Sequence, residues 1–98
     1  MATMLKLALT QKVSLAKDVL IQDLVQESVL LSLESEEYFG QNEVGTRMLS
    51  VLTESESIQA AYDVLLEEYE VEPERLQQDL LNFVEKLVDY ELVEVTGS

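Results

Sequence analysis

The chain lacks cysteine and histidine, and it contains a single proline and three glycines among 98 residues. Without cysteine the protein has no disulfide and no thiol nucleophile, and without either residue it has no zinc site of the Cys/His type. The missing histidine also excludes imidazole acid–base catalysis. We therefore expect no metal and no cofactor. The absence of cysteine suits the reducing cytoplasm, where we place the protein.

Basic residues are also scarce, because six lysines and arginines stand against 20 aspartates and glutamates, giving a net charge of −14. Acids and bases balance at three each up to Leu33, so the remaining 17 acids and three bases carry the whole imbalance. Such a surface repels phosphate, which makes nucleic acid and anionic membrane poor partners. The same charge suits a basic partner, or simply keeps acidic helices soluble.

Long apolar stretches are missing as well. No run approaches the length of a membrane span, and Met1–Leu9 carries Lys6 and lacks the features of a secretory signal. Nevertheless 47% of the residues are apolar, which at this length predicts one small folded domain. Residues 1–17 show no clear period, so we expect a flexible N-terminal arm there and the folded domain over residues 18–95.

Three strands are predicted in the first half of the domain. They are Asp18–Val25, with a turn at residues 26–27, then Ser28–Leu33, and then the short aromatic Glu37–Gly40. Valine or leucine occupies every odd-numbered position of 29–33, so one face of a half-buried second strand is apolar. Three strands are the minimum that holds together, and only when a helix covers one face.

The second half of the domain is predicted to form three helices. Asn42 is a suitable N-cap for a helix from Glu43 to about Leu52, and Ser57 for a second helix. Pro73 stands in the first turn of a third, where its missing N–H has no cost. The third helix carries a broad apolar stripe typical of a core-facing helix, made of Leu76, Leu80, Phe83, Val84, Leu87 and Val88. Residues 92–95 predict a short extended tail. The fold class is α+β, a three-stranded antiparallel sheet followed by a three-helix bundle.

The short third strand runs directly into a helix, so we expect it at a sheet edge. A bare edge presents unpaired N–H and C=O groups that an extended peptide can satisfy, while alternate side chains of that peptide supply specificity. Tyr38 and Phe39 are adjacent and point to opposite faces, so one of them packs inward. The sequence alone leaves open which one.

Two other classes of function, an enzyme and a DNA-binding protein, fit the sequence less well. Five glutamates surround Pro73, and carboxylate pairs can perform acid–base chemistry or bind calcium. The spacing lacks the calcium-loop order and no nucleophile–base pair accompanies it, so a solvated loop is the better interpretation and we expect no enzyme. DNA binding is disfavoured because the third helix carries only Arg75 and Lys86 among several acids.

The order of motifs resembles the PqqD-like family of precursor-peptide recognition proteins, also called RiPP recognition elements. The resemblance covers Asp18–Val95 and is most specific at Tyr38–Arg47, at Glu68–Val71, and from Asp79 to Leu87. It implies a fold related to winged helix-turn-helix domains. It also implies a non-catalytic protein, or peptide chaperone, that binds the leader of a ribosomally made precursor as a strand added to the third strand. The third helix would bound the groove.

Mapped onto this sequence, the resemblance places the leader between the third strand and the third helix. The expected leader-binding residues are Leu30, Glu37, Tyr38, Phe39, Gly40, Arg75, Leu76, Asp79, Leu80, Phe83, Val84 and Leu87. Phe83 or Leu76 would wall the groove, while Asp79 and Arg75 would contact polar leader groups. For most of these residues plain core packing, or for the charged ones a solvated surface, is the competing interpretation.

The chain departs from the family's usual pattern at three places. The family often has glycine in the turn where this chain has Ser35-Glu36, leucine at Gln41, and glycine at Glu91.

Two family settings compete for the partner, which in both is a maturation enzyme. The run Val44–Met48 with Glu68-Tyr69 favours a lasso-peptide leader peptidase. The alternative is a radical S-adenosylmethionine enzyme, as in pyrroloquinoline quinone biosynthesis. A winged-helix nucleic-acid-binding protein is the second alternative.

Overall fold

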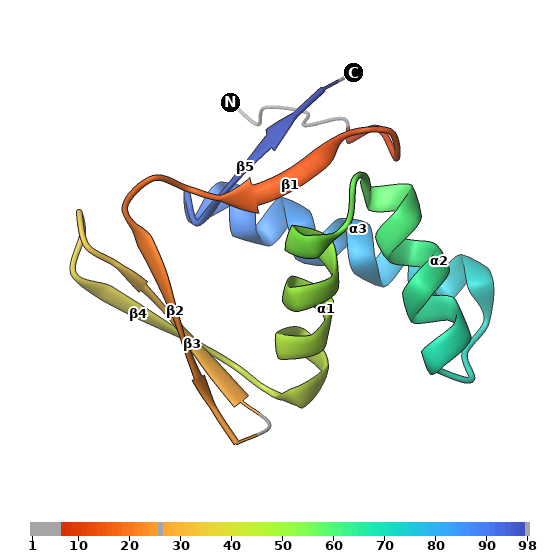
Figure 1. The fold of residues 1–98 in the computed structure, drawn as a ribbon, viewed down its shortest axis with the longest axis horizontal. Helices are drawn as coiled ribbons and strands as arrows, with labels where there is room; N and C mark the ends of the chain where they lie inside the picture. The colour runs from red at the N-terminus through yellow and green to blue at the C-terminus, as the bar shows by residue number, and fades with distance from the viewer. Residues whose placement is uncertain (1–6, 26, 98) are drawn as a thin grey trace.

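The computed structural model describes residues 7–25 and 27–97, and in that part of the chain it has two antiparallel sheets and three helices (Figure 1). The elements in chain order are β1 (Lys12–Leu15), β2 (Val19–Leu24), β3 (Glu27–Ser32), β4 (Glu37–Gln41), α1 (Glu43–Glu54), α2 (Ile58–Glu68), α3 (Pro73–Asp89) and β5 (Val93–Thr96). The predicted α+β class is confirmed. Within the described residues, no helix is long and apolar enough to cross a membrane.

The larger sheet is the predicted meander, with strand order β2-β3-β4 and antiparallel pairing throughout. Its strands begin and end within one residue of the predicted bounds. Residue 26 of the predicted turn lies outside the described residues, and β3 begins at Glu27. Among the described strands none pairs with the outer side of β4, so β4 is the sheet edge that the sequence predicted.

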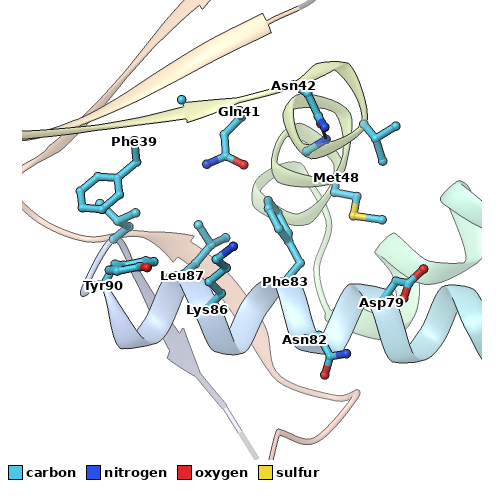
Figure 2. A pocket seen from close by; sticks show the side chains of 14 residues that line it. Phe39, Gln41, Asn42, Met48, Asp79, Asn82, Phe83, Lys86, Leu87 and Tyr90 are labelled. Carbon is cyan, nitrogen blue, oxygen red and sulfur yellow. Dashed lines mark hydrogen bonds between the residues drawn. The ribbon is translucent and has the colours of Figure 1, made fainter.

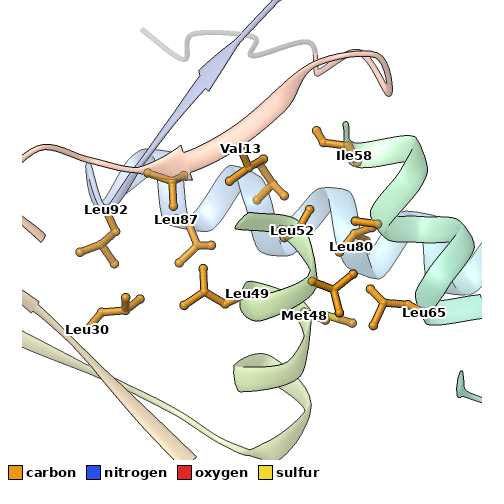
Figure 3. Packing of buried hydrophobic residues seen from close by; sticks show 14 of the residues in the cluster. Val13, Leu30, Met48, Leu49, Leu52, Ile58, Leu65, Leu80, Leu87 and Leu92 are labelled. Carbon is orange, nitrogen blue, oxygen red and sulfur yellow. The ribbon is translucent and has the colours of Figure 1, made fainter. Parts of the chain in front are cut away.

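The buried face of β3 is the opposite of the apolar face that the alternation indicated. Leu30 is completely buried and contributes to the core beside Leu49 and Leu92 (Figure 3). Ser28 is also buried, and its Oγ lies 2.8 Å from the Oγ1 of Thr46 in α1. The alternation misled because the covered face carries Ser28 and Ser32 on either side of Leu30, and the position of α1 decides which face is covered.

The uncovered face of this sheet is unusually apolar. The register pairs Leu20 with Leu31 and Leu31 with Tyr38, so these three side chains share it. Leu20 is 54% exposed and Tyr38 is 74% exposed. Leu24 and Leu33 are exposed near its ends. We call this surface, formed by Leu20, Leu24, Val29, Leu31 and Tyr38, the outer sheet face.

The predicted flexible arm is wrong for residues 12–15, which form β1 and pair with β5. Val13 is 1% exposed, so this strand contributes directly to the core. The Nζ of Lys12 donates to the carbonyl oxygens of Thr53 and Ser55, at 3.3 and 2.8 Å. These carbonyls lie at the C-terminal end of α1, where a cation is favourable. Residues 1–6 of the expected arm lie outside the described residues.

Local capping signals explain where the helices begin. The Oδ1 of Asn42 accepts from the Gly45 N–H at 2.8 Å, and the Oγ of Ser57 accepts from the Ala60 N–H at 3.1 Å. Pro73 is the first residue of α3. These three predicted helix starts are confirmed. The predicted extended tail is also confirmed, as β5.

Two glutamates adopt backbone angles that favour glycine. Glu36, in the turn between β3 and β4, has φ +60°, and Glu91, between α3 and β5, has φ +58°. These are two of the places where the chain departs from the family's usual glycine. Both turns therefore hold a glutamate in the left-handed conformation, which glycine adopts at lower cost.

Candidate functional site

A groove of about 670 Å³ lies between the edge strand β4 and helix α3 (Figure 2). Its walls come from three places, namely β4, the first turns of α1, and the side of α3 that faces them. The lining residues are Phe39, Gly40, Gln41, Asn42, Val44, Gly45, Met48, Asp79, Asn82, Phe83, Lys86, Leu87, Tyr90 and Leu92.

Helical spacing places the α3 residues in one line. Asp79, Phe83, Lys86, Leu87 and Tyr90 recur at intervals of three and four residues, and such intervals share one side of a helix. The deeper positions of the same helix, such as Leu80 and Val84, are turned into the core and are completely buried. Core packing thus fixes the orientation of α3, and this orientation presents Phe83 and Lys86 to β4.

Strand alternation settles which aromatic residue of β4 faces the groove. Phe39 and Gln41 point inward and line it, whereas Tyr38 belongs to the outer sheet face. The ring of Phe39 meets the ring of Tyr90, with centroids 5.0 Å apart and planes inclined by 40°. This tilted aromatic pair joins β4 to the end of α3 and closes one end of the groove.

The other end of the groove is formed where β4 passes into α1. Gly45 is buried there, and a Cβ at this position would lie only 2.8 Å from the Oε1 of Gln41. The missing side chain therefore leaves room for the Gln41 amide beside the helix start. This is the close packing that a glycine early in a predicted helix suggests.

The groove differs electrically from the rest of the molecule. Its charged lining residues are one acid, Asp79, and one base, Lys86, although the whole chain carries −14. The carboxylate of Asp79 lies 3.9 Å from the Nε of Arg75, in an exposed pair one helical turn apart. The groove is thus close to neutral and largely apolar, with a polar group toward either end.

A stronger ion pair stands outside the groove and joins α1 to α2. The Nε and Nη2 of Arg47 donate to the two carboxylate oxygens of Glu68 at 2.8 and 2.5 Å. The hydrogen bonds from Arg47 lower the pKa of the Glu68 carboxyl, and the same contact raises the pKa of Arg47. Both residues belong to motifs that carry the family resemblance, and their contact is structural.

The structure separates the predicted site residues into three groups. Phe39, Gly40, Asp79, Phe83 and Leu87 line the groove together. The buried group does not line it, and consists of Leu30, Leu76, Leu80 and Val84. The remaining three lie elsewhere, since Glu37 lines a separate acidic cleft, Tyr38 lies on the outer sheet face and Arg75 is exposed beside Asp79.

Sequence reasoning missed nine lining residues, namely Gln41, Asn42, Val44, Gly45, Met48, Asn82, Lys86, Tyr90 and Leu92. Helical spacing from Phe83 was a sufficient signal for Lys86 and Tyr90, at i+3 and i+7. No comparable signal existed for Val44 and Met48, because their place depends on the direction in which the chain leaves β4.

The part of the chain that the structure describes forms no metal site beside the groove. Among residues 7–25 and 27–97, no three or more aspartate or glutamate side chains are arranged so that they could hold an ion. The five glutamates around Pro73 therefore form no ligand cluster in this structure. What the groove offers chemically is an open strand edge and an apolar wall.

Comparisons with known proteins agree with this geometry. The family model for coenzyme PQQ synthesis protein D (PqqD) matches residues 27–93. A structure of TbiB1 in complex with the TbiA(beta) leader peptide aligns with a TM-score of 0.80 and 30% identity, covering 87% of this chain and 99% of that one. A structure of lasso peptide synthetase B1 complexed with the leader peptide shows the same fold, with a TM-score of 0.78, 23% identity, and coverage of 85% and 98%. No curated protein sequence matches the chain. The predicted membership is thus confirmed, and the chain belongs to the PqqD family.

Proposed function

We propose that this protein binds the leader segment of a ribosomally synthesised precursor peptide and delivers it to a maturation enzyme. The leader lies as an additional strand against β4, with alternate side chains entering the groove. The single observation that carries the proposal is the unpaired edge of β4 beside an apolar wall of α3. The protein itself is not a catalyst, because its sequence offers neither histidine nor cysteine and no nucleophile–base pair.

Strand addition explains how one site binds a peptide with modest sequence demands. The backbone groups on the open side of β4 supply hydrogen bonds to any extended chain, and the groove selects among side chains. The five residues of β4 span about 17 Å at roughly 3.4 Å per residue. A leader strand of similar length would therefore satisfy the whole edge.

The nature of the relatives supports the leader as the ligand. TbiB1, with 30% identity over most of this chain, was captured with a leader peptide. Lasso peptide synthetase B1 was also captured with a leader, which favours a lasso-type leader peptidase as the partner enzyme. The family's description supports the alternative, a peptide chaperone for a radical S-adenosylmethionine enzyme in coenzyme PQQ synthesis.

Delivery needs a second surface, and we assign it to the outer sheet face. A leader strand added to β4 would extend that sheet, so a partner covering the face would also meet the bound leader. Its exposed leucines and Tyr38 favour an apolar partner surface. Glu27 at one end and Glu34 and Glu36 at the other favour basic residues around it. The occupant is therefore the maturation enzyme, with a basic rim around an apolar patch.

Nucleic acid fits this protein poorly despite the related fold. Helix α3 carries four acids against Arg75 and Lys86, and a phosphate backbone requires a basic stripe. Duplex DNA should not bind at moderate salt.

Two neighbouring aromatic residues provide a test that separates the two surfaces. Phe39→Ala removes a groove side chain, and Tyr38→Ala removes one from the outer sheet face. We expect Phe39→Ala to weaken leader binding measured by calorimetry, and Tyr38→Ala to reduce enzyme-dependent processing of the bound precursor. Sedimentation tests whether a second copy of this chain covers the outer face instead, which would contradict the assignment to an enzyme.

Hydrogen exchange with and without leader peptide locates the ligand. The probe is the TbiA(beta) leader peptide. Amides of β4 should gain protection from exchange. The NMR signals of the α3 side chains that line the groove should change position when the leader is added. Protection confined to α2 or to the acidic loop before Pro73, with β4 unchanged, would refute strand addition.

A further inference from the structure

Resting on the proposed function, we infer that the strand bound at β4 carries a carboxylate side chain that pairs with Lys86. A large apolar side chain stands two residues before it and packs on the ring of Phe83. Lys86 is thereby a specificity-determining residue, because it fixes the direction and register of the bound peptide.

Among residues 7–25 and 27–97, Lys86 is the one cation that lines the groove. Figure 2 shows its side chain rising from α3 toward β4, beside Leu87. Among the described residues, both carboxylate pairs within 4.0 Å involve arginines, so Lys86 has no acidic partner there. In a chain of −14, an unpaired ammonium group in the ligand groove favours an anionic group on the ligand.

The dimensions of the groove determine how many ligand side chains it reads. From Asp79 to Tyr90 is eleven residues of α3, or about 16.5 Å at roughly 1.5 Å per residue. That length corresponds to about five residues of an extended strand, at roughly 3.4 Å each. Because alternate side chains share a face, three of the five point toward α3, at relative positions i, i+2 and i+4.

The direction of the bound strand follows from the order of the walls. Helix α3 runs in the direction opposite to β4, because Tyr90 packs on Phe39 while Asp79 lies near the end of β4 that leads into α1 (Figure 2). Antiparallel pairing continues the pattern of the sheet and is slightly more stable per residue than parallel pairing. An antiparallel peptide therefore passes Asp79 first, then Phe83, then Lys86.

This order assigns a chemical type to two of the three positions. Position i+2 faces the ring of Phe83, which suits a large apolar group. Position i+4 faces Lys86 and suits glutamate or aspartate. Position i lies by Asp79. The carboxylate of Asp79 is already 3.9 Å from the Nε of Arg75, so it sets no charge preference for the peptide side chain at position i.

The expected effect is on selectivity more than on total affinity, because a partly exposed ion pair contributes little by itself. Elsewhere the acidic surface disfavours an anionic peptide, whereas the groove accepts one. Replacing Lys86 by glutamate turns an attraction into a repulsion, so peptides with the carboxylate should lose about tenfold in affinity, and peptides with lysine there should gain.

The test uses a displayed library of 12-residue extended peptides in which alternate positions are randomised. Wild-type protein, Lys86→Glu and Lys17→Glu are each used for selection. Lys17 is exposed, lies outside the groove, and gives the same change in net charge. Enriched peptides are then checked for protection of β4 amides by hydrogen exchange.

We expect wild type and Lys17→Glu to enrich an acidic residue two positions after a large apolar one, and Lys86→Glu to replace that acid by lysine or arginine. Peptides that protect β4 but show no change of charge preference in Lys86→Glu would overturn the role of Lys86. An acid enriched two positions before the apolar residue would overturn the direction. Selection of no peptide that protects β4 would instead overturn the proposed function.

Discussion

Substitution of Glu91 by glycine should stabilise this protein, although Glu91 lies in the turn that follows the groove-lining helix. Glu91 has φ +58°, a conformation that costs an L-residue about 1–2 kcal/mol and glycine almost nothing. The turn has the hydrogen bonds of a Schellman motif, because the Leu92 N–H donates to the Leu87 carbonyl and the Glu91 N–H to the Val88 carbonyl, both at 2.9 Å. Glycine is the residue that this position of the motif usually holds.

The magnitude follows from two opposing contributions. Relief of the backbone strain contributes about 1–2 kcal/mol, and the larger chain entropy of glycine in the unfolded state removes about 0.4–1 kcal/mol. A net gain of about 0.5–1 kcal/mol remains. For a chain of 98 residues this raises Tm by about 2–5 °C. Calorimetry and chemical denaturation of Glu91→Gly against wild type measure it.

Two controls isolate the backbone effect from the loss of a negative charge. Glu91→Gln removes the charge and keeps the strain, so it should gain less than Glu91→Gly. Glu94→Gly makes the same substitution at an exposed position of β5, where it should cost about 0.5–1 kcal/mol. If Glu91→Gly destabilised the protein as much as Glu94→Gly, the argument from backbone strain would be refuted.

Three further predictions concern other parts of the fold. The ion pair with Arg47 lowers the pKa of Glu68, so the contribution of this pair to stability is complete above the ordinary pKa of 4.5 and is lost as pH falls through the lower folded value. The difference in unfolding free energy between wild type and Glu68→Gln should therefore shrink over that pH range, as measured by denaturation at several pH values. Phe83→Ala should weaken leader binding by more than it lowers the free energy of unfolding, and a loss of about 3–5 kcal/mol in stability alone would instead identify the ring as core. Lys12→Met should lower Tm by leaving the carbonyl of Ser55 without its charged donor, and an unchanged Tm would show that this contact contributes nothing.

Features set by neighbouring residues were predictable from the sequence. The N-caps Asn42 and Ser57 and the position of Pro73 determine helix starts through groups no more than three residues away. The edge position of β4 also followed, because a short strand leading straight into a helix leaves few other places for it.

Features set by distant residues were not predictable. The short strand β1 pairs with β5, about 80 positions away, and nothing in its own sequence marks it as half of a ladder. The inward face of β3 depends on where α1 packs, because this face holds two serines around Leu30 and is the less apolar of the two. For the same reason the α3 half of the groove could be anticipated in part from Phe83, whereas the half formed by Val44 and Met48 could not.

The ladder between β1 and β5 has a consequence for the order in which the protein folds during synthesis. The innermost pair is Leu15 with Val93, so the ladder closes a loop of nearly 80 residues, at an entropic cost of about 4 kcal/mol. The meander β2-β3-β4 needs only local contacts and forms first. Helix α3 packs with Leu92 and Val93 in the core, and these residues leave the ribosome after the helix itself. The nascent chain therefore exposes the edge of β4 before the opposite wall is in place, and full binding competence is acquired only when β5 docks.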